Sequence, residues 1–158
     1  HQTGRVIPIK FRFDVAMTGR LGMEMKPSDL SADELEYAKN AIKTYKEIRP
    51  IIQQGNQYRI ISPYEKTGYA SELYITDDKS EAIFFAYKFE HYVNQFRPRF
   101  HFAGLDPDAT YKLTEICRNG RTDHWEGRTF TGKFLMNQGV EIALDGLFSS
   151  KIIRLTKQ

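Results

Sequence analysis

Residues 31–54 show the clearest hydrophobic periodicity in the chain. Ser31 and Glu34 stand at the spacing of a capping box, in which each side chain binds a backbone amide at the start of a helix. Apolar residues then recur at steps of three and four, at Leu35, Ala38, Ile42, Tyr45 and Ile48. This pattern predicts an amphipathic helix that begins at Ser31 and packs one stripe against a larger body, which we expect upstream of it.

Pro50 interrupts the helical pattern. Proline has no amide hydrogen, and its ring clashes with the preceding helical turn, so we expect the helix to end near Ile48 or to kink there. Gly55 is expected to close any final turn. The break predicts two parts of the chain, residues 1–54 and residues 55–158.

After Gly55 the helical steps give way to alternation. Apolar residues alternate with polar or smaller ones at Tyr58/Ile60, Leu73/Ile75, Phe100/Phe102 and Val140/Ile142/Leu144. Turn-forming pairs such as Ser62-Pro63 and Asp145-Gly146 separate the runs. About eight short strands at this spacing predict an antiparallel β-sandwich. Residues 81–90 are apolar on both faces for part of their length, which predicts a central strand.

Composition limits the classes of partner. The 158 residues are 41% hydrophobic and 13% aromatic, enough for one good core or two small ones. No run approaches the roughly 18 apolar residues of a membrane span, and a formal charge of +3 is too small to favour nucleic acid. The single Cys117 and four scattered histidines predict neither a disulfide nor a metal site, and no cofactor is expected. These features do not assign the protein to a cellular compartment.

Four segments resemble a known family along nearly the whole chain. They are residues 11–25 (FRFDVAMTGRLGMEM), 49–65 (RPIIQQGNQYRIISPYE), 104–108 (GLDPD) with Tyr111, and 130–137 (FTGKFLMN). Together these segments resemble the carboxy-terminal part of the family 36 glycoside hydrolases, the α-galactosidases. The opening residues 1–5 (HQTGR) resemble the stretch that follows the acid/base aspartate in this family.

The resemblance implies a mainly β fold with one long helix in its amino-terminal half. Residues 1–54 would be the last β/α elements of a (β/α)8 barrel, the TIM barrel, and residues 55–158 an antiparallel β-sandwich. On this mapping residues 20–25 form the eighth barrel strand and residues 31–49 its outer helix. Residues 9–17 are ambiguous, because their apolar positions alternate as in a strand whereas the family mapping favours a short helix.

Retaining glycosidases need two carboxyl groups about 5 Å apart. In the barrel-like part only Asp14 and Glu24 lie close to a strand, and Glu24 is a candidate to line the substrate mouth at the carboxyl end of the strand. The alternative for such a residue is an ion pair with Arg12, Arg20 or Lys26. Neither carboxylate matches the two catalytic aspartates of the family, so no catalytic residue is assigned here and the isolated chain is predicted to be inactive.

Other residues have a structural interpretation beside a functional one. Trp125, Tyr64, Tyr69 and Tyr92 lie in turn-rich segments and are candidates for stacking on a sugar, although core packing would also explain aromatic residues in a sandwich. Arg97, Arg99 and His101 form a basic strip that could bind phosphate, although a solvated outer face or an interface with the barrel is the preferred interpretation. Cys117 is expected to be buried in a strand, and the glycine pairs at 19/22 and 127/132 to be turns.

The resemblance therefore predicts the carboxy-terminal segment of a retaining α-galactosidase. Its substrates would be terminal α-galactosides in oligosaccharides of the raffinose type, bound by an upstream barrel, and the segment itself would support the barrel and contribute to homo-oligomer contacts. Two alternatives stay open. One is a stand-alone carbohydrate-binding sandwich, and the other is an interaction domain without a ligand.

Overall fold

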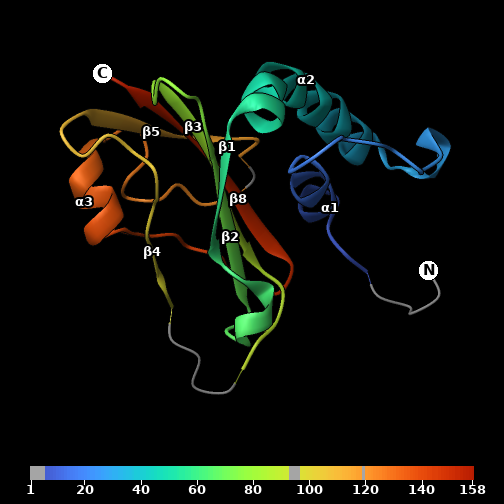
Figure 1. Cartoon of the computed structure of the whole chain (residues 1–158). Helices are drawn as coiled ribbons and strands as arrows, with labels where there is room; N and C mark the ends of the chain where they lie inside the picture. Colours follow the sequence, from blue (N-terminus) through green and yellow to red (C-terminus); the bar gives the residue numbers. More distant parts are fainter. Residues whose placement is uncertain (1–5, 93–96, 119) are drawn as a thin grey trace.

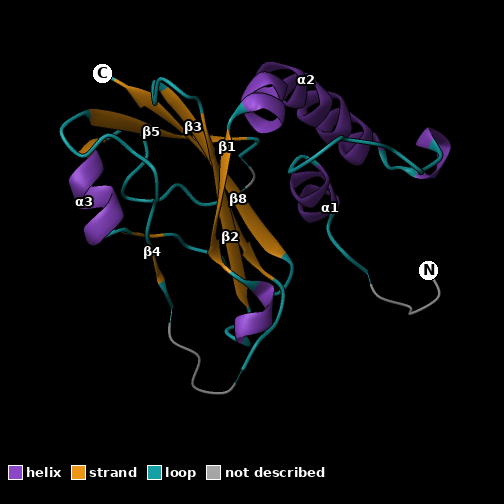
Figure 2. Cartoon of the chain, in the orientation of Figure 1, coloured by secondary structure: helices purple, strands orange, loops and turns teal. Residues whose placement is uncertain are grey.

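A six-stranded antiparallel sheet organises the computed structural model, which describes residues 6–92, 97–118 and 120–158. The sheet has the order β1-β2-β3-β8-β5-β6. Its strands are β1 (Asn56–Ile61), β2 (Tyr69–Ile75), β3 (Glu81–Lys88), β5 (Thr110–Ile116), β6 (Thr129–Thr131) and β8 (Ser149–Lys157). A short ladder of β4 (Arg99–Phe100) and β7 (Val140–Glu141) forms a second sheet. The predicted antiparallel sandwich is confirmed (Figures 1 and 2).

The inner face of the large sheet packs on the second sheet, the short helix α3 (Gly132–Asn137) and the loops between them. Phe84 of β3 lies against Phe100 and Phe102, with ring centroids 6.1 and 4.5 Å away. Trp125 is fully buried in this layer, and its indole nitrogen donates to the Glu141 carbonyl at 3.1 Å. This core closes the sandwich.

Two helices cover the outer face of the same sheet (Figure 1). They are α1 (Ile9–Ala16) and α2 (Ala32–Gln54), and two single 3-10 turns, η1 (Pro27–Asp29) and η2 (Pro63–Glu65), complete the elements. Phe85 and Tyr87 of β3 face these helices, whereas Phe84 faces the sandwich interior. Apolar cover on both faces explains why residues 81–90 carry apolar side chains on both sides, and the predicted central position of β3 is confirmed.

The start of α2 and its stripe follow the sequence pattern closely. The Ser31 hydroxyl accepts from the Glu34 amide, and the Glu34 carboxylate accepts from the Ser31 amide, so the predicted capping box is present. The buried positions are Ala38, Ala41, Tyr45, Ile48, Ile51 and Ile52. Leu35 and Ile42 are only half-buried, which rotates the buried stripe slightly from the predicted one.

The expectation that the stripe of this helix packs on a body upstream of it is confirmed only in part. That stripe packs on Phe13 and Met17, in and just after α1, and on Tyr74, Ile83, Phe85 and Ile152 of the sheet. The helix and the sheet are thus joined by one apolar layer.

The prediction that α2 ends near Ile48 is wrong, because the helix continues through Pro50 to Gln54. A proline inside a helix costs about 3 kcal/mol, but Ile48, Ile51 and Ile52 around it are all buried. Each such side chain contributes about 1.5–3 kcal/mol on burial, so packing outweighs the proline. Gly55 closes the final turn as predicted, because its backbone N–H donates a hydrogen bond to the Ile51 carbonyl at 2.9 Å.

The amino-terminal segments resolve one ambiguity and correct one expectation. The segment 9–17 is not a strand, because residues 9–16 form the helix α1 and Met17 caps it. Residues 20–25 were expected to form a barrel strand, yet they form a loop, and no described strand lies beside them to supply ladder hydrogen bonds. Residues 1–5, which contribute to the family resemblance, lie outside the described residues. Within the described part, no helix is long and apolar enough to span a bilayer.

Gly55 joins α2 to β1 at a point where two backbones approach closely. A Cβ atom there would lie 2.5 Å from the Ile51 carbonyl oxygen and 2.7 Å from that of Ile75. We therefore expect Gly55→Ala to lower the free energy of unfolding by about 1–3 kcal/mol, measured by urea denaturation. The matched control is Gly22→Ala, because nothing lies within 4 Å of a Cβ atom there. Equal stability of the two variants would contradict this account of the junction.

Candidate functional site

The two carboxylates singled out in the sequence occupy different environments. Glu24 is exposed in the loop before η1, and no ion pair joins it to Arg12, Arg20 or Lys26 among the described residues. Asp14 is fully buried on α1. An exposed and a fully buried carboxylate do not form the facing pair that a retaining glycosidase uses. The placement of Glu24 at a substrate mouth stays a prediction.

Asp14 is the centre of a buried polar cluster between the helices and the sheet. Its Oδ2 atom lies 2.7 Å from Lys10 Nζ and accepts from the Ser150 hydroxyl of β8, also at 2.7 Å. The Tyr37 hydroxyl of α2 donates to Oδ1 at 3.4 Å, and the Tyr87 hydroxyl of β3 donates to the Asp14 carbonyl at 3.0 Å. Burial raises the pKa of Asp14, and Lys10 acts in the opposite direction. The cluster connects α1, α2, β3 and β8.

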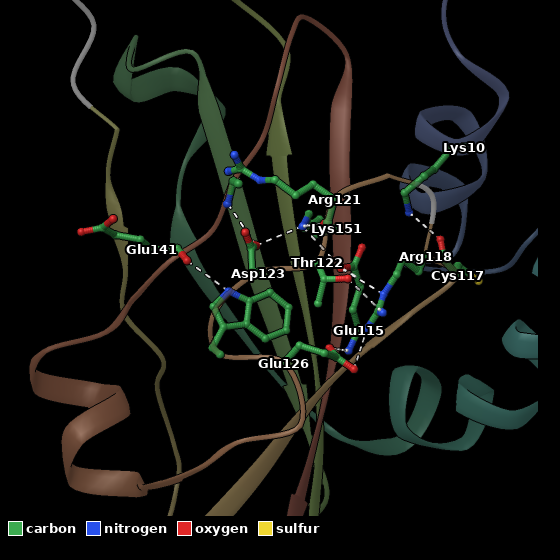
Figure 3. Close-up of polar contacts among 12 residues, drawn as sticks. Lys10, Glu115, Cys117, Arg118, Arg121, Thr122, Asp123, Glu126, Glu141 and Lys151 are labelled. Atoms are coloured by element: carbon green, nitrogen blue, oxygen red, sulfur yellow. Dashed lines mark hydrogen bonds and ion pairs between the residues drawn. The ribbon is translucent and has the colours of Figure 1, made fainter.

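Lys10 also ties α1 to the loop after β5. Its Nζ donates to the Cys117 carbonyl at 3.0 Å (Figure 3), in addition to its ion pair with Asp14. Cys117 itself follows β5 rather than lying within it and is half-buried, so the predicted burial in a strand is wrong in position. Burial raises the pKa of its thiol, which disfavours the reactive thiolate form.

A second charged cluster surrounds Lys151 of β8 (Figure 3). Lys151 Nζ lies 3.0 Å from Asp123 Oδ2 and 3.4 Å from Glu115 Oε2, and it donates to the Arg121 carbonyl at 2.9 Å. Arg118 pairs with Glu126 at 2.6 Å and approaches Glu115 at 3.7 Å. Neither oxygen of Glu115 accepts a hydrogen bond from a described residue, so charge alone compensates its burial.

These clusters have the chemistry of a scaffold. Lys10 ties Cys117 to α1, and Lys151 ties Arg121 and Asp123 to the sheet. In the described part of the chain, no group of three or more metal-ligating side chains converges on a point. Their contacts instead set the position of α1 on the sandwich.

The remaining sequence candidates separate by exposure. Trp125 and Tyr69 are buried in the core, whereas Tyr64 is 90% exposed. Tyr92 is half-buried, and its hydroxyl donates to Glu90 at 2.6 Å. The glycine pairs lie in or beside turns, with Gly132 at the start of α3.

The basic strip is exposed, and its two arginines form ion pairs with nearby carboxylates. Arg99 pairs with Glu141 at 3.2 Å and Arg97 with Asp145 at 3.8 Å. His101 Nδ1 lies 3.2 Å from the Met136 carbonyl. The neighbouring Phe100 and Phe102 are buried, so neither offers this strip an exposed ring on which a base could stack.

A groove of about 400 Å³ lies at the β1–β2 edge of the sheet, and of its lining residues only Tyr64 was a binding candidate from the sequence. Tyr64 lines it together with Arg59, Ile61, Pro63, Ala70 and Glu72. Arg59 and Glu72 are partners across the ladder, although they lie 13 positions apart in the chain. Only the register of β1 on β2 brings them together, so no motif signals them.

Comparison with protein-family models matches residues 69–155, more than half of the chain, to the glycosyl hydrolase family 36 C-terminal domain. Residues 1–55 match the melibiase family. The probable alpha-galactosidase C of Aspergillus flavus is 34% identical over 158 residues, which cover 99% of this chain and 19% of that relative. The chain thus spans about a fifth of the length of the curated relatives it matches first.

Solved structures agree with this match. The family 36 alpha-galactosidase AgaB of Geobacillus stearothermophilus superposes with a TM-score of 0.86 at 30% identity, over 100% of this chain and 20% of AgaB. A variant of AgaA from the same organism, in complex with raffinose, gives a TM-score of 0.87 at 28% identity, again over 100% of this chain and 20% of that one.

Removing the charge of Asp14 should be costly. Asp14→Asn keeps the side-chain volume and an acceptor for Ser150 but leaves Lys10, which is 8% exposed, without its counter-charge. We expect a loss of about 3–5 kcal/mol in the free energy of unfolding, measured by urea denaturation at pH 7. The matched control is Glu36→Gln, which removes an exposed pair with Lys39 at 3.8 Å and should cost at most about 1 kcal/mol. Similar losses in both variants would contradict the role of Asp14.

Glu115 should make stability depend on pH. Its burial raises its pKa, and Lys151 offsets the rise only in part. The folded state then binds a proton that the unfolded state releases, so this contribution is full below the ordinary value of 4.5 and is lost as pH rises through the folded pKa. The test compares the unsubstituted chain with Glu115→Gln. The free energy of unfolding of the first minus that of the second should fall as pH rises from about 4 towards about 7, the range in which a carboxyl group with a raised pKa titrates. Asp14 is common to both proteins and cancels. A difference that rises with pH would refute the assignment.

Proposed function

This chain belongs to glycoside hydrolase family 36, and on that premise we propose that it is the carboxy-terminal part of a retaining α-galactosidase. The parent enzyme would hydrolyse terminal α-D-galactosyl linkages in oligosaccharides of the raffinose type. Support for this substrate class comes from the α-galactosidase relatives and from the AgaA variant, whose structure contains raffinose. The catalytic aspartates would lie upstream of these residues.

We further propose that residues 1–54 are the last elements of the catalytic barrel and residues 55–158 the sandwich that follows it. The melibiase match over residues 1–55 and the C-terminal-domain match over 69–155 support a boundary at Gly55. In the fold, Gly55 is the point where α2 passes directly into β1. Glu24, exposed in the loop before α2, is available to line the substrate mouth of such a barrel.

One observation supports the proposal that this segment holds the end of the barrel in place. The outer face of the sandwich sheet and the stripe of α2 form one continuous apolar layer, in which Asp14, Lys10 and Ser150 are bonded. Helix α1 carries both Asp14 and Lys10, so it cannot slide on the sheet without breaking the bond of Asp14 to Ser150 and that of Lys10 to the Cys117 carbonyl. The sandwich would therefore hold the last barrel helices in place, and a displacement of about 1 Å at an active site can cost a hundredfold in rate.

An antibody raised against residues 56–158 tests the proposal in the organism that makes the protein. The precipitated polypeptide should be about five times the 18.4 kDa mass of this chain, because the chain is 19% of the Aspergillus flavus relative. The precipitate should hydrolyse an aryl α-galactoside, and the purified 158-residue chain should not. Pre-immune serum is the control.

Two outcomes would overturn the proposal. One is turnover by the purified 158-residue chain itself. The other is a native polypeptide of 18.4 kDa without activity, which would favour the stand-alone carbohydrate-binding module.

A further inference from the structure

The groove at the β1–β2 edge presents hydrogen-bonding groups that the fold leaves unused. Arg59 and Glu72 face the same side of the sheet as cross-strand partners. Arg59 is exposed, and among the described residues its guanidinium forms no hydrogen bond or ion pair. The groove therefore offers a free set of donors beside a carboxylate.

Glu72 is held in place by only one of its two oxygens. Its Oε2 accepts from the Gln57 amide at 2.7 Å and from the Tyr74 hydroxyl at 3.1 Å. No described residue bonds the other oxygen, Oε1, which stays available as an acceptor. Two contacts on one oxygen orient the carboxylate, so its free oxygen has a defined position.

An aromatic ring completes the groove and is presented by an ordered turn. Tyr64 sits on η2, where the Ser62 hydroxyl accepts from the Tyr64 amide at 3.3 Å and the Ser62 amide donates to Glu65 at 3.0 Å. Its ring is 90% exposed, although Ile61, Pro63 and Ala70 nearby provide an apolar lining. A large exposed ring on a hydrogen-bonded turn beside a concave, partly apolar site is typical of a ligand contact.

These features together select one chemical class of ligand. One positive and one negative side chain cancel in net charge, so neither an anion nor a cation gains from the site as a whole. Sugar hydroxyls both donate and accept, which suits Arg59 and Glu72 at once, and the C–H face of a pyranose packs on an aromatic ring. The groove lies next to α1, because one of its lining residues, Tyr87, donates a hydrogen bond from its hydroxyl to the Asp14 carbonyl.

We propose that this groove binds a galactose-containing oligosaccharide, with Tyr64 as the stacking platform and Arg59 and Glu72 as the hydroxyl partners. The choice of galactose rests on the proposed function, whereas the class of neutral sugar rests on the groove itself. The site gives the carboxy-terminal sandwich a direct contact with the substrate class of the parent enzyme.

Titration of the ¹⁵N-labelled 158-residue chain with raffinose tests this assignment. Amide shifts should concentrate at residues 59–64 and 70–72, and Tyr64→Ala should weaken binding about tenfold or more. Tyr64→Phe should retain binding, because it keeps the ring. Arg59→Met should also weaken binding. Tyr92→Ala removes a tyrosine outside the groove and should leave the affinity unchanged. Unshifted peaks in the core will show that each variant is folded.

Three results would overturn the proposal. They are no shift at these residues, shifts that persist in Tyr64→Ala, and an equal response to sucrose, which is raffinose without its galactosyl residue. The titration reports on the isolated chain and the antibody experiment on the parent protein. A failure of the groove to bind sugar therefore leaves the proposed parent enzyme untouched. A failure of the parent proposal would remove the choice of galactose but not the neutral-sugar site.

Discussion

The structure depends on one sheet whose two faces must both be kept from water. Phe84 and Leu155 point into the sandwich, while Phe85 and Ile152 on the same strands point towards the helices. One covering layer cannot bury both sets, because successive side chains of a strand face opposite sides. The short sheet and α3 cover one face, and α1 and α2 cover the other (Figure 2). Removing either layer would expose the middle of the sheet.

Buried charge makes this packing specific as well as stable. Apolar contact alone would tolerate several positions of a helix on a flat sheet, since the hydrophobic effect has no direction. Asp14 pairs with Lys10 and with Ser150, and Lys10 reaches onward to the Cys117 carbonyl. Lys151 holds the same loop from the sheet side through Asp123 and the Arg121 carbonyl. One arrangement satisfies all of these groups.

The two proposed roles use different parts of the sandwich. Support for the barrel comes from the middle of the outer face, where side chains are buried and polar groups are bonded to one another. The sugar groove lies at the edge, where Arg59 and one oxygen of Glu72 are left unbonded by described residues. A free donor and a free acceptor at an exposed edge cost little, because water satisfies them until a ligand does. The same polar groups under α2 would be destabilising.

Local signals in the sequence were sufficient for the parts of the fold that depend on near neighbours. The Ser31/Glu34 cap, the turn at Gly55, the central position of β3 and the antiparallel sandwich all followed from spacing and alternation. The family also followed from collinear motifs. These features were predictable because caps, turns and strand faces involve residues that are close in the chain.

Tertiary contacts decided the rest. The continuation of α2 through Pro50 required three isoleucines to be buried by strands and a helix distant in sequence. The loop at residues 20–25 reflects the absence of a described strand beside it. The Asp14–Ser150 bond spans 136 positions, and the Arg59–Glu72 pair exists only through the β1–β2 register. A sequence pattern records what each residue prefers locally, whereas burial and long-range pairing depend on which surfaces meet when the chain folds.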